Sequence, residues 1–558
     1  MKMKHILGLI IFLIVIGVGV VLGYKYLPTK TVPEKPKTEY IASDLTEVIL
    51  YDTEYNESLK LVRGSKVYVY SKEIVNEDST YKKVTYDNKE YLVNINNLVK
   101  KEKDVVKENE LYVRTSTTIY KDMDTAEILS FVKKGEKVEV VGFDKINEDG
   151  TVNKYKIKYN DSVGYVYSKY LVTTEEESKK VYSENGIMDY MATMGSSLGG
   201  GAAVNLDFYP YDKPKFEDNV MPDEARTLYI NSAAIRDIKT YVDFAVNNNI
   251  NALVIDIKDN TSPAYNSPIT KKYSPTNYER ALNNYEDYKN YVKIAKEAGL
   301  YLIGRITTFK DSYFINDHKE IAISNSNGDP FSHNGSYWPS AFNRYVWEFN
   351  VELAREAVRE IGFNEIQFDY VRFPDRTGNL EKNGTINLKN IYEEEKAQAI
   401  QAFVMYACDS IHELGAYVSI DVFGESANNY VTAYGQFWPA ISNVADVISG
   451  MPYPDHFNIH EYGISEVVWE VPYKVLYQWG KTVAAKQSVI PTPAVVRTWI
   501  QTYNATRAPH TIYDANKISD QIQALYDNGL RGGFMTWNSA SSIYKYNEVA
   551  YAFRKVYE

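Results

Sequence analysis

The stretch that decides the fold is Glu365-Ile366-Gln367-Phe368-Asp369-Tyr370-Val371-Arg372-Phe373-Pro374. Its first five residues predict a short buried strand. Because side chains alternate along a strand, Ile366 and Phe368 are expected to face a helical layer, while Gln367 and Asp369 face the other side. A buried carboxylate is costly unless it is paired. Asp369 at the end of this strand therefore indicates a polar site rather than plain core.

The same pattern, a short apolar strand followed by an amphipathic helix, recurs from residue 222 to the C-terminus. We expect eight strands, at residues 227–230, 252–256, 301–305, 365–369, 417–421, 447–451, 489–492 and 533–537. Helices are expected between them, for example at 237–248, 288–298, 346–361, 397–414 and 519–528. Several of these helices are followed by glycine, the usual residue after a helix end. Eight such units predict an α/β fold, a (β/α)8 TIM barrel over residues 222–558, with an open parallel sheet as the alternative.

Acidic residues stand where an active site is expected. In a barrel of this kind the site lies at the carboxyl ends of the strands. Asp256 ends the second strand, Asp369 the fourth and Asp421 the fifth, and Glu425 follows shortly after. Each acid taken alone could be a helix cap or one half of an ion pair. Their recurrence at one end of the barrel, with the three aspartates on the inward face, indicates a site.

Two carboxyl groups suit the hydrolysis of a glycosidic bond. One protonates the leaving oxygen, and the other attacks the anomeric carbon or activates water. We expect Asp369, close in sequence to Arg372, to be the ionised partner, and either Asp421 or Glu425 to be the acid. Polar, basic and aromatic side chains at the strand ends are expected to bind the sugar: Asp256, Lys258, Arg305, Tyr370, Arg372, Tyr453, Trp537 and Asn538.

Two small all-β modules are expected ahead of the barrel. Residues 110–173 show short alternating strands and resemble a bacterial SH3-like domain, from Leu111-Tyr112-Val113-Arg114 to Gly164-Tyr165-Val166-Tyr167-Ser168-Lys169-Tyr170-Leu171. Residues 44–100 repeat this pattern in degenerate form about 71–74 residues earlier. The resemblance implies binding to cell-wall peptidoglycan, and a passive spacer is the alternative. Residues 174–221 are expected to be a linker that leads into the barrel.

The N-terminus predicts a membrane anchor. Residues 6–22 are uninterrupted apolar residues or glycine, and the run to residue 24 is near the length that crosses a bilayer. It lacks the small-residue site of a cleaved signal peptide. We therefore expect a transmembrane anchor at residues 1–27 and a charged, proline-containing tether at 28–43. This arrangement predicts a single-pass protein of the cell membrane, with the bulk of the chain extracytoplasmic.

Three barrel segments carry a further resemblance. Residues 254–259, 365–374 and 419–424 resemble those of a bacterial glycoside hydrolase family with a TIM barrel, distantly similar to α-amylase-type barrels. The resemblance implies that Asp369 occupies the position of the nucleophile. The family's acid follows strand five, so Asp421 and Glu425 both stay open. Because the chain shows no His-Asp pair after strand seven, starch specificity is not implied.

Composition narrows the remaining functions. A net charge of −11 without a basic face argues against nucleic-acid binding, and the single cysteine, Cys408, excludes an internal disulfide or a cysteine metal cluster. No cofactor or metal is expected, and the partner is a polysaccharide or oligosaccharide substrate. Two alternatives stay open. One is a non-catalytic surface protein that binds glycan or a protein partner. The other is a metal-dependent polysaccharide deacetylase, suggested by the four-residue spacing of His456 and His460.

Overall fold

A computed structural model describes residues 35–194 and 199–557. Its contacts divide the chain into two compact units. One unit holds the residues up to 109 together with 140–155, and the other holds residues 110–139 and 156–558. The barrel and most of the β module before it therefore belong to one unit.

The first β module is a seven-stranded sheet in the order β3-β2-β6-β5-β4-β1-β7. Its strands are β1 (Lys37–Ile41), β2 (Glu47–Tyr51), β3 (Glu57–Val62), β4 (Lys66–Asn76), β5 (Ser79–Tyr86), β6 (Lys89–Asn94) and β7 (Leu98–Val99). Strand β1 pairs with both β4 and β7. The expected tether over 28–43 is thus wrong for residues 37–41, because their alternating side chains complete the sheet.

The second β module repeats this topology. Its order is β10-β9-β13-β12-β11-β8-β14, which is the first order with every strand number raised by seven. The strands are β8 (Glu110–Val113), β9 (Thr117–Tyr120), β10 (Ile128–Val132), β11 (Lys137–Phe143), β12 (Lys154–Tyr159), β13 (Ser162–Tyr167) and β14 (Leu171–Val172). The internal repeat is therefore confirmed, while its likeness to SH3 domains stays a resemblance in sequence.

The strands after residue 222 form a nearly closed parallel barrel. They are β15 (Ala225–Ile230), β16 (Ala252–Asp259), β18 (Tyr301–Thr307), β22 (Glu365–Asp369), β24 (Tyr417–Phe423), β25 (Val447–Met451), β26 (Val495–Val496), β27 (Thr498–Gln501) and β28 (Gly533–Trp537). Neighbours in the chain are neighbours in the sheet, and β28 pairs with β15 to close the ring. Strands β26 and β27 are separated only by Arg497 and share the seventh position. The expected TIM barrel is therefore consistent with the structure.

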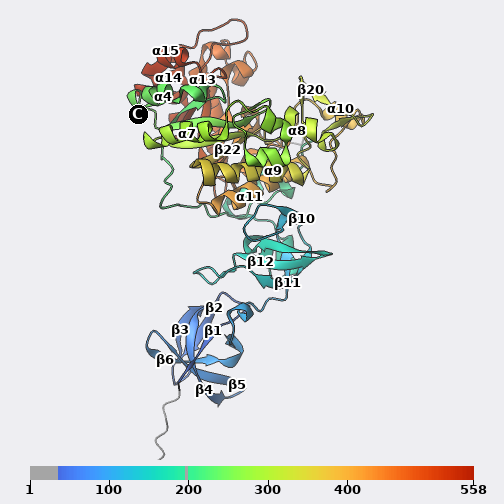
Figure 1. The fold of residues 1–558 in the computed structure, drawn as a ribbon, viewed down its shortest axis with the longest axis vertical. Helices are drawn as coiled ribbons and strands as arrows, with labels where there is room; N and C mark the ends of the chain where they lie inside the picture. The colour runs from blue at the N-terminus through green and yellow to red at the C-terminus, as the bar shows by residue number, and fades with distance from the viewer. Residues whose placement is uncertain (1–34, 195–198, 558) are drawn as a thin grey trace, which may run out of the picture. The chain divides into compact units, whose positions relative to one another are not determined.

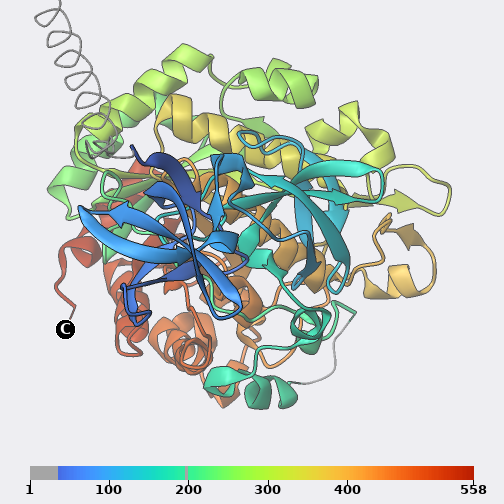
Figure 2. The same ribbon diagram turned by 90° about the horizontal axis from the view of Figure 1, so that it is seen from below.

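Helices surround the barrel strands, as Figure 1 shows around β22. The longer ones are α4 (Ile238–Asn247), α7 (Tyr285–Glu297), α9 (Arg344–Glu356), α11 (Lys396–His412), α13 (Pro472–Gln487), α14 (Ala515–Tyr526) and α15 (Ile543–Arg554). The shorter ones are α5 (Pro268–Tyr273), α6 (Pro275–Glu279), α8 (Ser312–Asp317), α10 (Gly378–Lys382) and α12 (Trp438–Ser442). In Figure 2 the green-to-yellow helices lie along one side of the barrel and the orange-to-red helices along the other.

The alternation expected for strand β22 is observed. The ring of Phe368 packs against that of Phe403 on α11, with centroids 5.4 Å apart. Gln367 instead donates to Ser449 on β25 and contacts Met535 on β28, so it points into the barrel. The barrel interior is filled by the buried side chains of Ala225, Tyr229, Ala252, Val254, Tyr301, Ile303, Tyr417, Tyr453, Trp499 and Met535.

The seventh strand lies six residues later than expected. Residues 489–492 form no strand, and the chain becomes extended only at Val495. The strand was missed in the sequence because Arg497 interrupts its apolar pattern, and a charged side chain is not expected inside a core. Arg497 can be fully buried because an ion pair with Glu365 on β22, at 2.7 Å, neutralises its charge.

The second β module is packed onto the barrel within its unit. Arg114 forms an ion pair with Asp207 at 3.3 Å, and Tyr170 donates to Asp409 on α11 at 2.7 Å. The lead-in over residues 174–221 contains α2 (Glu175–Lys179) and α3 (Ile187–Ala192). Its apolar side chains join the buried cluster that includes Phe437 of the barrel domain.

Among residues 35–194 and 199–557, no helix combines the length and apolar character that a membrane span needs. The expected anchor at residues 1–27 lies outside the described residues, so it stays a prediction.

Candidate active site

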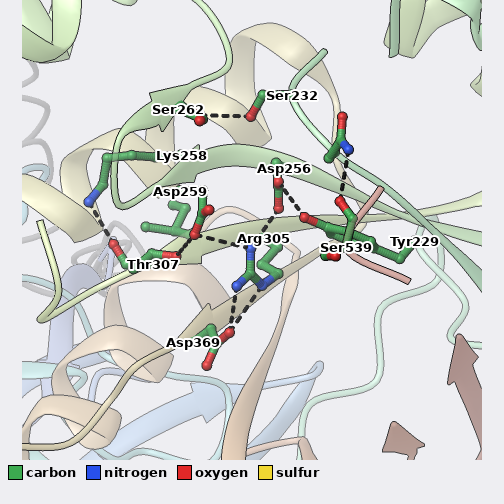
Figure 3. Close-up of polar contacts among 12 residues, drawn as sticks. Tyr229, Ser232, Asp256, Lys258, Asp259, Ser262, Arg305, Thr307, Asp369 and Ser539 are labelled. Carbon is green, nitrogen blue, oxygen red and sulfur yellow. Dashed lines mark hydrogen bonds and ion pairs between the residues drawn. The ribbon is translucent and has the colours of Figure 1, made fainter. Parts of the chain in front are cut away.

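Arg305 on β18 is the centre of the polar cluster at the carboxyl ends of the strands (Figure 3). Its guanidinium lies 2.8 Å from Asp256 Oδ1 and 2.6 Å from Asp369 Oδ2. Asp259 Oδ1 is 3.7 Å from the same group. Because Arg305 is 2% exposed and its partners Asp256 and Asp369 are also buried, these are ion pairs in a low-dielectric setting. The acids that the sequence placed on two separate strands are thus joined through one arginine.

The register of the strands accounts for this cluster. Asp256 on β16 is the direct partner of Arg305 on β18, and Thr307, two residues further on, is the partner of Asp369 on β22. Tyr229, one strand earlier, donates its hydroxyl to Asp256 at 2.6 Å. Burial, together with Asp259, raises the pKa of Asp256 to about 6, although Arg305 acts in the opposite direction. Through its hydrogen bond to the guanidinium, Asp256 holds Arg305 in place.

Asp369 is held at both of its oxygens. Oδ2 accepts two hydrogen bonds from Arg305, at 2.6 and 3.2 Å, and Oδ1 accepts one from the backbone N–H of Tyr370 at 2.6 Å. Tyr370 has a positive φ of 54°, which an L-residue with a large side chain adopts at a cost. Together these three hydrogen bonds fix the orientation of the Asp369 carboxylate at the end of β22. The backbone strain lies directly beside the group expected to react.

Asp421 on β24 is the second inward carboxyl group. It is fully buried, and Trp499 on β27 donates its indole N–H to Oδ1 at 2.8 Å. Oδ2 has no hydrogen-bond partner among the described residues. Burial, and then the negative charge of Asp369, raise the pKa of Asp421 well above its ordinary value, while Arg305 and Trp499 oppose the rise. Burial thus favours the protonated form of Asp421, the form in which a carboxyl group can act as a general acid.

Aromatic rings lie beside the charged cluster. Trp537 lies 4.8 Å from the ring of Tyr229 and 5.6 Å from that of Trp499, and Tyr453 stacks on Trp537 at 6.4 Å. The guanidinium of Arg305 lies 5.5 Å from the centroid of Trp537. Trp537 and Tyr453 thus lie where the sequence placed them, and Trp537 is partly exposed. Tyr229 and Trp499 were not predicted from the sequence. The alternation of side chains along the first strand would have placed Tyr229 on the inward face.

Lys258 does not reach the cluster. A register shift in β16 between Asp256 and Lys258 turns its side chain away. The ammonium group donates to the carbonyl of Thr307 and to Asp311 Oδ2, both at 2.6 Å, and the residue is 0% exposed. The expectation that Lys258 binds substrate is therefore corrected. The charge of Lys258 is already neutralised by its buried ion pair with Asp311.

Asn538 is also used by the protein itself. Its side chain donates to the carbonyl of Thr502 at 2.9 Å and accepts from the backbone N–H of Ser542 at 3.1 Å. These two bonds order the loop between β28 and Ser542, the residue that caps α15. Asn538 is buried, so the expected contact with a sugar hydroxyl is not supported.

Arg372 and Glu425 lie elsewhere than expected. Arg372 pairs with Asp375 at 3.2 Å, and the basic partner of Asp369 is Arg305 instead. Glu425 is exposed and accepts hydrogen bonds from Tyr430 and Tyr434 at 3.1 and 2.9 Å. Glu425 therefore belongs to the surface beside the site, whereas Asp369 and Asp421 belong to its buried part.

The two histidines behind the deacetylase alternative do not share a helix. His456 ends the short 3-10 helix Pro454–His456, and His460 precedes another at Glu461–Gly463. Within the described ranges, no group of three or more His, Cys, Asp or Glu side chains is arranged to hold a metal ion. The spacing of four residues therefore does not place two imidazoles on one face.

Comparison with known proteins now adds to this geometry. Residues 227–544 match the model of the family DUF4015, described as "Putative glycosyl hydrolase domain". The chain belongs to this family. The match begins in the first barrel strand and ends in the last helix, so the family domain is the barrel with its cluster of acids. No match was found among the curated proteins.

Solved structures give more distant likenesses to this family member. A hypothetical protein from Ruminiclostridium thermocellum ATCC 27405 is 29% identical, over 35% of this chain and 97% of its own, with a TM-score of 0.29. The PgaB (BpsB) glycoside hydrolase domain from Bordetella bronchiseptica is 13% identical, over 59% and 98%, with a TM-score of 0.43. A beta-N-acetylhexosaminidase from Bacteroides fragilis NCTC 9343 is 13% identical, over 60% and 66%, with a TM-score of 0.40.

Proposed function

We propose that the barrel is a glycoside hydrolase that works with two carboxyl groups, Asp369 and Asp421. The observation that carries this proposal is the position of these two buried carboxyl groups at the carboxyl ends of the paired strands β22 and β24. Three donors hold the Asp369 carboxylate in place. Burial next to Asp369 raises the pKa of Asp421, which favours the protonated form that a general acid needs. Membership of the glycosyl hydrolase family supports the same reaction class.

In this mechanism Asp421 gives its proton to the glycosidic oxygen as the bond to the anomeric carbon breaks. Asp369 attacks that carbon or takes the proton of the water that attacks it. Arg305 fixes Asp369 and steadies its charge, and Asp256 and Tyr229 fix Arg305. Trp537 provides a partly exposed ring face for a sugar. Because Asp421 is fully buried, the aromatic side chains around it must move when the sugar enters.

Asp421 is favoured over Glu425 as the acid. A general acid has to be protonated near neutral pH and has to lie beside its partner carboxylate. Burial raises the pKa of Asp421, and Asp421 lies on the strand paired with that of Asp369. Its Oδ2 also has no partner among the described residues that would compete with a substrate oxygen. Glu425 is exposed and bonded to two tyrosines. Glu425 would then contact substrate at the edge of the site.

The proposed setting is the outer face of a cell membrane. The apolar run at residues 6–24 is near the length that crosses a bilayer, and it supports a single-pass anchor that leaves the bulk of the chain extracytoplasmic. We propose a cell-wall or extracellular polysaccharide as the substrate. Binding of peptidoglycan is proposed for the first β module, because the second module is packed onto the barrel.

The test is turnover by the purified chain on a panel of peptidoglycan and of neutral, amino and acidic exopolysaccharides. We expect new reducing ends from at least one glycan. On that glycan, Asp421→Asn should lower kcat by about 10²- to 10⁴-fold, the usual contribution of a general acid. Glu425→Gln should keep kcat within about tenfold, as expected for a contact outside the proton transfer.

Two outcomes would contradict the proposal. Wild-type protein that binds a glycan tightly and releases no reducing ends would be a binding protein instead. A loss of kcat with Glu425→Gln and none with Asp421→Asn would move the acid to Glu425. Thermal unfolding of both variants, beside the wild type, shows whether any loss of kcat comes from unfolding.

A further inference from the structure

Two basic side chains flank Tyr370, the residue after Asp369. The ammonium group of Lys310, in the loop after β18, lies 4.8 Å from the centroid of the Tyr370 ring. The guanidinium carbon of Arg372 lies 5.1 Å from the same centroid. Both are attached to the loops that follow neighbouring strands of the barrel. Neither has a role in the two-carboxylate mechanism.

Arg372 is held rigidly but is only partly used. Its guanidinium lies 4.9 Å from the centroid of Trp338 and 4.3 Å from that of Phe423, so it is held among aromatic rings. Its Nη1 donates to the carbonyl of Phe373 at 3.0 Å and to Asp375 at 3.2 Å. No hydrogen bond joins its Nε or Nη2 to another residue of the described chain. These are two adjacent donors in the fork that binds carboxylate or phosphate.

Lys310 has no ion-pair partner within 4 Å among the described residues. It is partly buried, and this burial lowers its pKa, while Asp259 and Asp369 act in the opposite direction at longer range. Burying part of a cation without an ion-pair partner is unfavourable by itself. An anion placed between Lys310 and Arg372 would remove that cost. Both cations would then face one group.

Arg305 shows the contrast. It is as buried as the acids around it, and it is already neutralised by direct contacts with Asp256 and Asp369. Lys310, by contrast, has no ion-pair partner within 4 Å among the described residues, and Arg372 uses only Nη1 in its pair with Asp375. The chain as a whole carries a net charge of −11, so it repels polyanions in general. Attraction of an anion to this site has to be local.

We propose that Lys310 and Arg372 form a subsite for an anionic substituent of a sugar ring, a carboxylate or a phosphate, beside Asp369. This inference rests on the proposed function, because it names the class of glycan that the glycosidase takes. The guanidinium fork of Arg372 would bind the anion through Nε and Nη2, and Lys310 would add a second charge. The ring of Tyr370 lies against both cations.

The experiment compares acidic oligosaccharides with their neutral counterparts. The probes are oligogalacturonate, oligomannuronate and oligoglucuronate, each beside its carboxyl-reduced form, and a phosphorylated oligomannoside beside its dephosphorylated form. Binding to the full chain is measured by calorimetry, and hydrolysis is measured by reducing ends. Each pair has the same linkage, so a difference within a pair reports the anionic group. The carboxylate and phosphate pairs distinguish the two sources of the anion.

At least one acidic probe should bind about tenfold or more tightly than its neutral partner, because hydrogen bonds to charged groups contribute about 1.5–3 kcal/mol. Lys310→Gln and Arg372→Gln should each lower that ratio by about tenfold. Arg376→Gln is the control, since Arg376 lies in the same loop with its side chain 93% exposed. It should leave the ratio unchanged.

The proposal is overturned if no acidic probe binds, if acidic and neutral partners bind alike, or if Lys310→Gln and Arg372→Gln both keep the wild-type ratio. Failure of the proposed function looks different. In that case an acidic probe binds with the expected preference and dependence on Lys310 and Arg372, but no reducing ends form. Hydrolysis of neutral glycans with no preference for acidic ones would keep the glycosidase and reject the anionic subsite.

Discussion

At the scale of single residues, Trp499 holds the carboxyl group of Asp421 in place. Its indole N–H is the only described hydrogen-bond donor to this buried acid, and that bond stabilises the charged form. Burial and the charge of Asp369 act more strongly in the opposite direction. Their balance favours the protonated form of Asp421, and Trp499 holds its Oδ1 in place. Trp499 is a positioning residue under the proposed mechanism.

Trp499→Phe should raise the pKa of Asp421 further, because it removes a donor to the carboxylate form. An active acid loses activity as pH rises through its pKa, so the alkaline limb of kcat should move to higher pH. The measurement is the pH profile of kcat on a glycan that the wild type hydrolyses. Trp347→Phe is the matched control, since Trp347 donates to the carbonyl of Ala341 and makes no contact with Asp421. A limb that stays in place or moves to lower pH contradicts this role.

At the scale of elements, strand ends could be predicted because their alternation is visible in the sequence. Asp256, Asp369 and Asp421 were all expected on the inward face, and the structure places their side chains there. The pairing between them could not be predicted. Asp369 was assigned to Arg372, which is only three positions away in the sequence. The register of the sheet instead brings it to Arg305, which is 64 positions away. Spatial partners across a parallel sheet leave no local signal.

Two further predictions were wrong because each involved a charged residue that is buried and paired inside the fold. Arg497 broke the apolar pattern of the seventh strand, yet Glu365 neutralises it inside the barrel. Lys258 looked like a strand-end ligand, yet a register shift turned it toward Asp311. In both cases the deciding partner is more than 50 residues away in sequence. A charged residue in a strand can therefore belong to the core, and only its partner in the folded structure shows whether it does.

At the scale of the whole molecule, the two β modules share a topology but differ in what their last turn carries. Asn97 ends the 3-10 helix Ile95–Asn97 of the first module, and Tyr170 ends the helix Ser168–Tyr170 of the second. Tyr170 is buried and donates to Asp409 on α11. Tyr167, three residues earlier, donates to Glu413 at 2.7 Å. The second module is thus built as part of the barrel unit.

Tyr170→Phe should lower the free energy of unfolding of the barrel unit by about 1–3 kcal/mol, because it leaves the buried oxygen of Asp409 without its donor. Urea unfolding of the full chain, followed by tryptophan fluorescence, measures this loss, since the tryptophans named above are in the barrel. Tyr165→Phe is the control on the same module, because Tyr165 is half-buried and its ring lies beside Lys156. Equal stability of Tyr170→Phe and wild type would mean that the module adds nothing to the barrel.

The central claim is that Asp369 reacts with the sugar, and the kcat of Asp369→Asn tests it most directly. The account predicts a fall of about 10²-fold or more on a glycan that the wild type hydrolyses, with binding of that glycan retained. Asp218→Asn, at an exposed acid beside Asn219, which bonds to the loop before β22, should keep wild-type kcat. If Asp369→Asn is folded and keeps more than about a tenth of wild-type kcat, Asp369 is not the reacting carboxylate.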